Sequence, residues 1–109
     1  MVNKQKVDNM LLELGFPEHL QGTQMLRLAV SEYRPGMAIV KELYPAIAAA
    51  CNSTPSRTER AIRHAIESVW RHGSAMEQYK YFGSSVDPER GKPVNGHLIA
   101  RLAYLANED

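Results

Sequence analysis

A single long helical pattern, over residues 54–71, constrains the fold of this chain more than any other feature. Small and apolar side chains recur there at spacings that place them on one broad face of an α-helix, with Trp70 at its edge. The residues of this face are Thr58, Ala61, Ile62, Ala65, Ile66 and Val69. Thr54 is suited to cap the helix, Pro55 to occupy its first position and Gly73 to end it. The segment therefore predicts an amphipathic helix whose apolar face must be buried.

The rest of the chain also has helical spacing, because Ala, Leu, Met and Glu recur at helical intervals and no β-branched alternation is present. We predict an all-α domain of about six helices. Besides the helix that begins at Thr54, helices are expected over 4–14, 21–33, 37–51, 75–81 and 96–106, with a short helical turn at 16–20. Gly15 should close the first helix, Pro45 should break or kink the 37–51 segment, and Asn95 should cap the last helix. Residues 83–93 are typical of a loop.

Length and composition limit the class of protein. A chain of 109 residues predicts one domain, 1–109, with a core large enough to need no metal or disulfide. Cys51 is the single cysteine, which excludes an internal disulfide and a cysteine-based zinc site. No stretch reaches the roughly 18 apolar residues of a membrane helix, and the N-terminus is polar. We therefore expect a cytoplasmic protein that has no contact with a membrane.

The polar face of the 54–71 helix carries the strongest functional signal. The whole chain has a formal net charge of only +1, which predicts no global attraction to nucleic acid. From Ser56 to His72, however, four arginines stand against Glu59 and Glu67, a local charge of +2. A short helix containing Ala48 and the tight polar connection 52–54 precede this segment. This order has the spacing of a helix-turn-helix over about residues 45–71, whose second helix enters the DNA major groove.

The N-terminal part of that second helix supplies side chains suited to duplex DNA. Arginine pairs with guanine O6 and N7, which makes Arg60 and Arg63 candidate base readers, and Glu59 can accept from cytosine N4. The candidate phosphate ligands are Thr54, Ser56, Arg57 and His64, together with the free amides at the start of the helix. An arginine-rich face is also typical of an ordinary solvated helix, and composition and spacing leave both interpretations open.

No other pattern predicts chemistry. His19, His64, His72 and His97 do not have familiar metal-ligand spacing, and the chain lacks a glycine-rich phosphate loop, a nucleophile elbow and a paired-carboxylate motif. We expect no enzymatic activity, no cofactor and no metal site. Tyr79 and Tyr81 are candidates for a partner surface, although helical spacing also fits a place at the rim of the core.

The segments 43–48 and 56–67 resemble the C-terminal DNA-binding effector domain of the sporulation master response regulator, the stage zero sporulation protein A family. Residues 12–17, Trp70, 82–83 and 92–95 also fall where that domain has similar residues, so the resemblance covers nearly the whole chain. It implies six helices around a helix-turn-helix and binding of double-stranded DNA at an element resembling TGTCGAA. It also implies a homodimer on tandem sites and regulation of transcription.

The resemblance also assigns individual positions. The base-reading positions of the family fall on Glu59, Arg60 and Arg63, and its backbone contacts fall around Arg57 and His64. The segment that contacts the RNA polymerase sigma factor in the family corresponds to about residues 75–86 here. Its candidate contact residues are Glu77, Tyr79, Phe82 and Val86.

Residues 75–81 depart from the small polar residues expected there in the family, and two larger features also depart from the family pattern. The phosphoacceptor receiver domain that precedes this domain in the family is not part of these residues, so phosphorylation control is not expected to reside in them. The family tail tends to be basic, whereas this one ends in Asn107-Glu108-Asp109. The leading hypothesis is a sequence-specific transcriptional regulator that acts on the bacterial nucleoid. The alternative is a helical protein-interaction module that has lost specific DNA binding.

Overall fold

The chain is built from α-helices, and the computed structural model describes residues 2–83 and 92–107. The prediction of an all-α domain with six helices is confirmed for these residues. The helices are α1 (Lys4–Leu14), α2 (Gln21–Glu32), α3 (Tyr44–Ala50), α4 (Pro55–His72), α5 (Ala75–Phe82) and α6 (Asn95–Ala106), with a π-helical turn η1 (Ile39–Leu43) before α3. No strand occurs in the described ranges, where the extended backbone forms only an isolated bridge between Val2 and Asn107.

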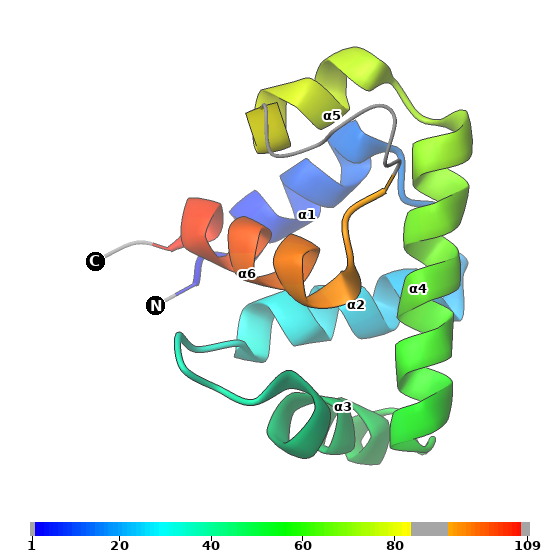
Figure 1. Ribbon diagram of the computed structural model, residues 1–109, viewed down its shortest axis with the longest axis vertical. Helices are drawn as coiled ribbons and strands as arrows, with labels where there is room; N and C mark the ends of the chain where they lie inside the picture. Colours follow the sequence, from blue (N-terminus) through cyan, green and yellow to red (C-terminus); the bar gives the residue numbers. More distant parts are fainter. Residues whose placement is uncertain (1, 84–91, 108–109) are drawn as a thin grey trace.

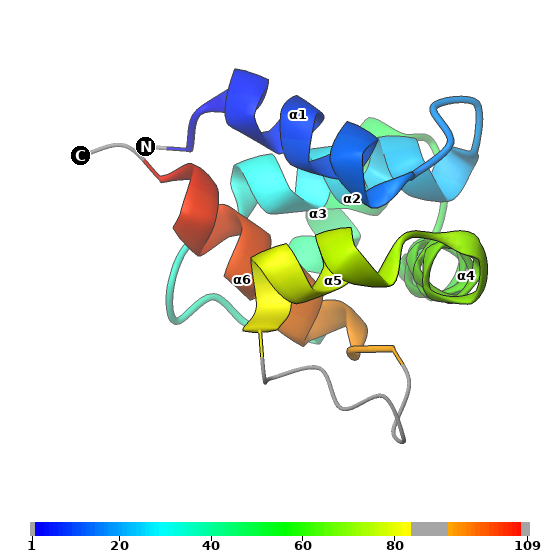
Figure 2. The same cartoon turned by 90° about the horizontal axis from the view of Figure 1, so that it is seen from above.

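Helix α4 stands along one side of the molecule, and the other helices pack against its inner face (Figure 1). Helix α3 lies at the N-terminal end of α4 and α5 lies at its C-terminal end, while α1, α2 and α6 fill the space between them. The view from above shows α4 end-on at the margin of the fold (Figure 2). One face of the longest helix is therefore left toward solvent.

The core receives side chains from all six helices. On α4, Thr58, Ile62, Ala65, Ile66 and Val69 are buried, which confirms the predicted apolar face. The largest fully buried partners from other helices are Leu11, Leu14, Met25, Leu26, Ile47, Leu98, Ile99 and Leu102. Burying such side chains is the main favourable contribution to folding, at about 1.5–3 kcal/mol each.

The ends of the helices follow the local chemistry of the sequence. Thr54 Oγ1 accepts the amide of Arg57 at 3.2 Å, so Thr54 caps α4 as predicted. Gly15 adopts φ +92° after α1, a left-handed conformation that glycine tolerates and other residues adopt at a cost. Gly73 ends α4, with its amide donating to the carbonyl of Val69.

Three local predictions need correction. Residues 16–20 form a hydrogen-bonded turn rather than a helical segment, with the amide of Leu20 donating to Pro17 O. The break predicted at Pro45 is confirmed, since Pro45 lies in the first turn of α3, but the piece before it is a loop followed by η1 rather than an α-helix that begins near Met37. Asn95 is the first residue of α6 rather than its cap, and Val94 occupies the cap position without a side-chain bond.

The first turn of α2 touches the backbone of α4. Gly22 is buried there, and a Cβ atom at this position would lie 2.1 Å from the carbonyl oxygen of Ala61. A contact that short is impossible, and the obstacle is main chain rather than the end of a flexible side chain. Glycine is therefore required for α2 to approach α4 this closely.

We expect Gly22→Ala to lower the free energy of unfolding by ~1–3 kcal/mol, because α2 and α4 must separate to admit the methyl group. Gly96→Ala is the matched control, since Gly96 is also the second residue of a helix and its added Cβ would be 3.7 Å from the nearest atom, Ile39 Cγ1. That control should stay within ~1 kcal/mol of wild type or gain stability from helix propensity. Urea unfolding of both variants tests this, and equal destabilisation would contradict it.

Candidate nucleic-acid interface

A tight turn sets the angle between α3 and α4. Asn52 has φ +54°, a left-handed conformation that asparagine tolerates better than most residues. The amide of Ser53 donates back to the carbonyl of Ala48 at 2.8 Å, which closes the end of α3. The chain then enters α4 directly at Thr54 and Pro55. Two helices are thus joined at a fixed angle by a short, hydrogen-bonded connection.

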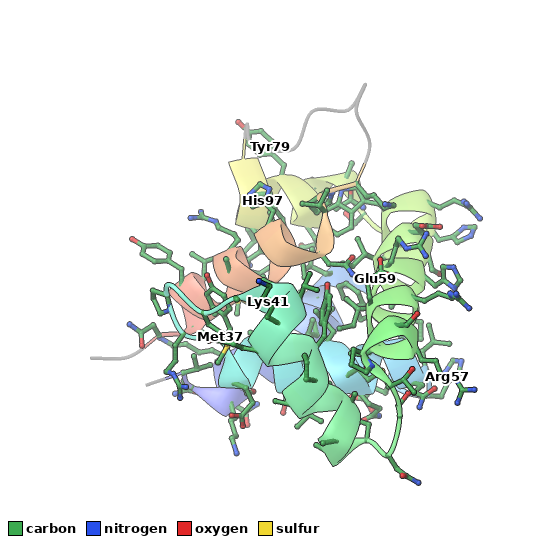
Figure 3. The ribbon with its side chains drawn as sticks, turned by 60° about the horizontal axis from the view of Figure 1, so that its bottom comes forward. Met37, Lys41, Arg57, Glu59, Tyr79 and His97 are labelled. Carbon is green, nitrogen blue, oxygen red and sulfur yellow. The ribbon has the colours of Figure 1, made fainter. Side chains whose placement is uncertain are left out.

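The outer face of α4 is basic. The exposed residues on it are Ser56, Arg57, Arg60, His64, Arg71 and His72. Figure 3 shows Arg57 pointing away from the body of the molecule. Within residues 2–83 and 92–107, neither Arg57 nor Arg60 makes an ion pair. Both guanidinium groups therefore keep their hydrogen-bond donors available to a ligand.

Two of the three predicted base readers contact each other. Arg63 Nε donates to Glu59 Oε1 at 3.0 Å, one helical turn apart, and both side chains are about 40% exposed. An ion pair this exposed contributes little net stability, so it can be exchanged for contacts to a ligand. It nevertheless holds the guanidinium of Arg63 close to the surface of α4.

The N-terminus of α4 is open to solvent. Thr54 and Ser56 are exposed, and the Thr54 hydroxyl accepts the Arg57 amide while its own hydrogen remains free to donate. The helix dipole places partial positive charge at this end. The predicted phosphate ligands Thr54, Ser56, Arg57 and His64 are thus all on the outer surface, with the first three in the first turn of α4 or at its cap.

Sequence reasoning missed a polar link behind α4. The side-chain amide Nδ2 of Asn95 donates to the carbonyl oxygen of Glu59 and to the hydroxyl of Tyr44, each at 3.1 Å. The segment 92–95 contributed to the family resemblance, but its spacing did not distinguish a cap from a long-range contact. Lys92 in the same segment lies 3.9 Å from the carboxylate of Glu67 on α4.

The predicted surface on α5 is only partly exposed. Tyr79 is 69% exposed, and Met76, which the sequence did not single out, is 78% exposed. Phe82 is buried, with its ring 5.4 Å from that of Trp70 in an edge-on arrangement, so it supports α5 rather than forming its surface. Glu77 is half-buried, and Val86 lies outside the described residues.

Helix α5 is fixed to α1 by a polar cluster. Glu13 Oε2 accepts hydrogen bonds from Tyr81 Oη at 2.5 Å and from Lys80 Nζ at 2.9 Å. The Tyr81 and Lys80 hydrogen bonds lower the pKa of Glu13 below its usual value. Burial and the neighbouring carboxylate raise the pKa of Tyr81 to about 12. At neutral pH the cluster therefore contains an ionised Glu13 and a protonated Tyr81.

Between 2–83 and across 92–107, no three His, Cys, Asp or Glu side chains come together where they could hold a metal ion. In the same ranges, no helix has the length and apolar character needed to cross a bilayer.

The chain matches a known protein family over most of its length. Residues 7–105 match the family model described as "Sporulation initiation factor Spo0A C terminal". The matched region contains α3, α4 and α5 in full and every residue discussed above as part of the interface. The family is non-enzymatic and consists of DNA-binding transcriptional regulator domains.

The lowered pKa of Glu13 predicts a pH-dependent contribution to stability. Its folded-state pKa lies below the reference value of 4.5, so the contribution is complete above that value and is lost as pH falls through the folded pKa. We expect Glu13→Gln to be less stable than wild type at pH 7, with a difference that shrinks as the pH falls below 4.5. Urea unfolding across this range tests it, with Glu18→Gln as an exposed control. A difference independent of pH would contradict it.

Proposed function

This chain belongs to the Spo0A C-terminal family of DNA-binding transcriptional regulator domains in sporulation, and we propose that it reads a TGTCGAA-like element with α4 in the major groove. In this proposal, Arg60 and Arg63 contact base edges in the groove. Glu59 contributes to the choice of base sequence by accepting a hydrogen bond from cytosine N4. Thr54, Ser56, Arg57 and His64 hold the phosphate backbone on either side of the groove.

The observation that carries this proposal is the free basic face of α4. The helix spans 18 residues, or about 27 Å, and stands at the margin of the fold. A helix fits the roughly 12 Å width of the major groove only if its flanks are clear of the rest of the protein. The exposed Arg57 and Arg60 without acidic partners in the described residues supply the donors that phosphates and guanine require.

The Glu59–Arg63 pair supports a reading role for both side chains. Glu59 Oε1 and Arg63 Nε are already in contact, so binding exchanges one exposed ion pair for base contacts and leaves no charge unpaired. Arg60 starts without such a partner and approaches its base without breaking an existing bond. We therefore assign the largest single contribution to specificity to Arg60.

The near-neutral charge supports binding as a homodimer on tandem elements. With a net charge of +1, one copy has little non-specific attraction to DNA, because that attraction depends on the number of phosphates neutralised. Two copies on adjacent elements add their base contacts and reach useful affinity without a strongly basic surface.

A second contact, with the RNA polymerase sigma factor, is proposed for α5. Tyr79 and the neighbouring Met76 expose large apolar surfaces to solvent, whereas Glu77 on the same short helix is half-buried with its Oε2 atom enclosed and adds less to this surface. Helix α5 is tied to α1 through Glu13, so a partner would meet a fixed surface. Aromatic and methionine side chains are enriched at protein interfaces.

Arg60→Ala should weaken binding to the TGTCGAA-like duplex by about 1–3 kcal/mol and relax discrimination against a scrambled duplex. Arg71→Ala is the matched control, because Arg71 is an exposed arginine on the same helix but three turns away. It should change the affinity for both duplexes alike. Fluorescence anisotropy at several salt concentrations measures both. Wild-type binding that neither discriminates between the duplexes nor depends on salt would favour the protein-interaction module instead.

Tyr79→Ala should leave DNA affinity unchanged and lower activated transcription several-fold, because the side chain lies on α5 and away from the basic face of α4. In-vitro transcription with purified RNA polymerase holoenzyme on a promoter carrying the element tests this. Tyr104→Ala removes an equally exposed tyrosine from α6 and serves as the control. Equal activation by the Tyr79 variant and wild type would exclude Tyr79 from the contact.

A further inference from the structure

The first residue of α6 binds the helix that we place in the DNA groove. Asn95 Nδ2 is 3.1 Å from Glu59 O on α4 and 3.1 Å from Tyr44 Oη on α3. Both hydrogens of one amide nitrogen are thereby used, and one side chain joins both helices of the helix-turn-helix to α6. Figure 1 shows the first turn of α6, in orange, on the inner side of α4.

The position of Asn95 is unusual for an asparagine near a helix start. Asparagine is among the preferred capping residues, yet the cap of α6 is Val94, whose side chain forms no hydrogen bond to the helix. Moving the cap one residue along would turn the amide back onto its own helix. The fold instead leaves α6 without a side-chain cap and directs the amide toward α4.

The acceptor on α4 is the main chain of a proposed base reader. In an α-helix, the carbonyl of residue 59 also faces the amide of residue 63, so Asn95 uses its second lone pair. The side chain of the same Glu59 holds Arg63 through the 3.0 Å ion pair. The amide of Asn95 therefore fixes the backbone from which two of the three proposed base readers are presented.

Tyr44 gives the amide a rigid second anchor. Tyr44 is only 5% exposed, and its hydroxyl accepts a hydrogen bond from Asn95. Burial raises the pKa of Tyr44, the Asn95 hydrogen bond opposes this and the nearby Glu59 charge adds to it, and the net effect is a raised pKa that keeps the hydroxyl neutral across the physiological range. The acceptor that Asn95 meets on α3 therefore does not change its charge when DNA phosphates approach.

We infer that Asn95 is a positioning residue for DNA reading, which sets the place of the N-terminal half of α4 relative to α3 and α6 without touching DNA. The inference rests on the proposed function. A reading helix must be held to within about half an ångström for bidentate base contacts, and supporting hydrogen bonds behind it provide that precision. Phosphate contacts by long flexible side chains tolerate larger displacements.

The test separates positioning from loss of folded protein. Asn95→Ala should lower the affinity for the TGTCGAA-like duplex about two- to tenfold, leave the affinity for a scrambled duplex unchanged, and leave the salt slope unchanged because no phosphate ligand is lost. A smaller folded fraction would lower both affinities by the same factor. Tyr44→Phe, which keeps the bond to Glu59, should show a smaller effect of the same kind. Asn9→Ala, on α1, is the asparagine control.

A second measurement identifies the path of the effect. In an Arg63→Ala background, Asn95→Ala should reduce specific binding less than it does in wild type, because one of the side chains that Asn95 positions is already absent. Fully additive effects would overturn the inference. If Asn95→Ala fails to fold, the same cycle is run with Asn95→Asp, whose carboxylate cannot donate to the carbonyl of Glu59.

The outcomes distinguish this inference from the proposed function. If wild type discriminates between the duplexes and Asn95→Ala discriminates equally well, the positioning role is wrong and the proposed function stands. If Asn95→Ala weakens binding to both duplexes equally, Asn95 contributes to stability alone and the positioning role is also wrong. If wild type itself does not discriminate, both the proposed function and the role of Asn95 are wrong.

Discussion

The arrangement of this domain depends on one backbone contact, where the first turn of α2 meets the middle of α4. Gly22 has no side chain, and the carbonyl of Ala61 occupies the space that a Cβ would take. Because the helices approach this closely, the apolar face of α4 reaches the core around Ile62 and Ile66. The other helices cover one face of α4, and the opposite face is left in solvent. The basic surface is thus a consequence of how the buried face is held.

Helix α4 is held at three places along its N-terminal half. Thr54 closes its first turn, Gly22 admits α2 beside Ala61, and Asn95 binds the carbonyl of Glu59 from α6. These groups come from three different parts of the chain. A helix-turn-helix of two helices has too little apolar area to be stable alone, and here the surrounding helices provide both its core and its orientation.

Local features were predictable from the sequence, and features that depend on distant partners were not. The start of α4 followed from Thr54 and Pro55, and its buried face followed from helical periodicity, since both depend on neighbours within a few residues. Asn95 was assigned to a cap because a capping residue and a long-range donor look alike in sequence. The contact of Gly22 with Ala61 gave no signal in the sequence, because it depends on a partner 39 residues away. On α5, periodicity did not separate the exposed Tyr79 from the buried Phe82, because a helix this short completes barely two turns.

The charges of the interface explain how a nearly neutral chain can act on DNA. Four arginines lie on α4, but Arg63 is paired with Glu59, while Arg57 and Arg60 are unpaired among the described residues. The attraction of α4 to phosphate therefore comes from Arg57 and Arg60 in its first two turns and from the exposed Arg71 in its last turn. Non-specific binding grows with the number of phosphates neutralised, whereas discrimination grows with base contacts. In the mode of binding proposed above, a chain with a net charge of +1 gains little from arbitrary DNA, so its affinity would depend on the match between α4 and the sequence in the groove.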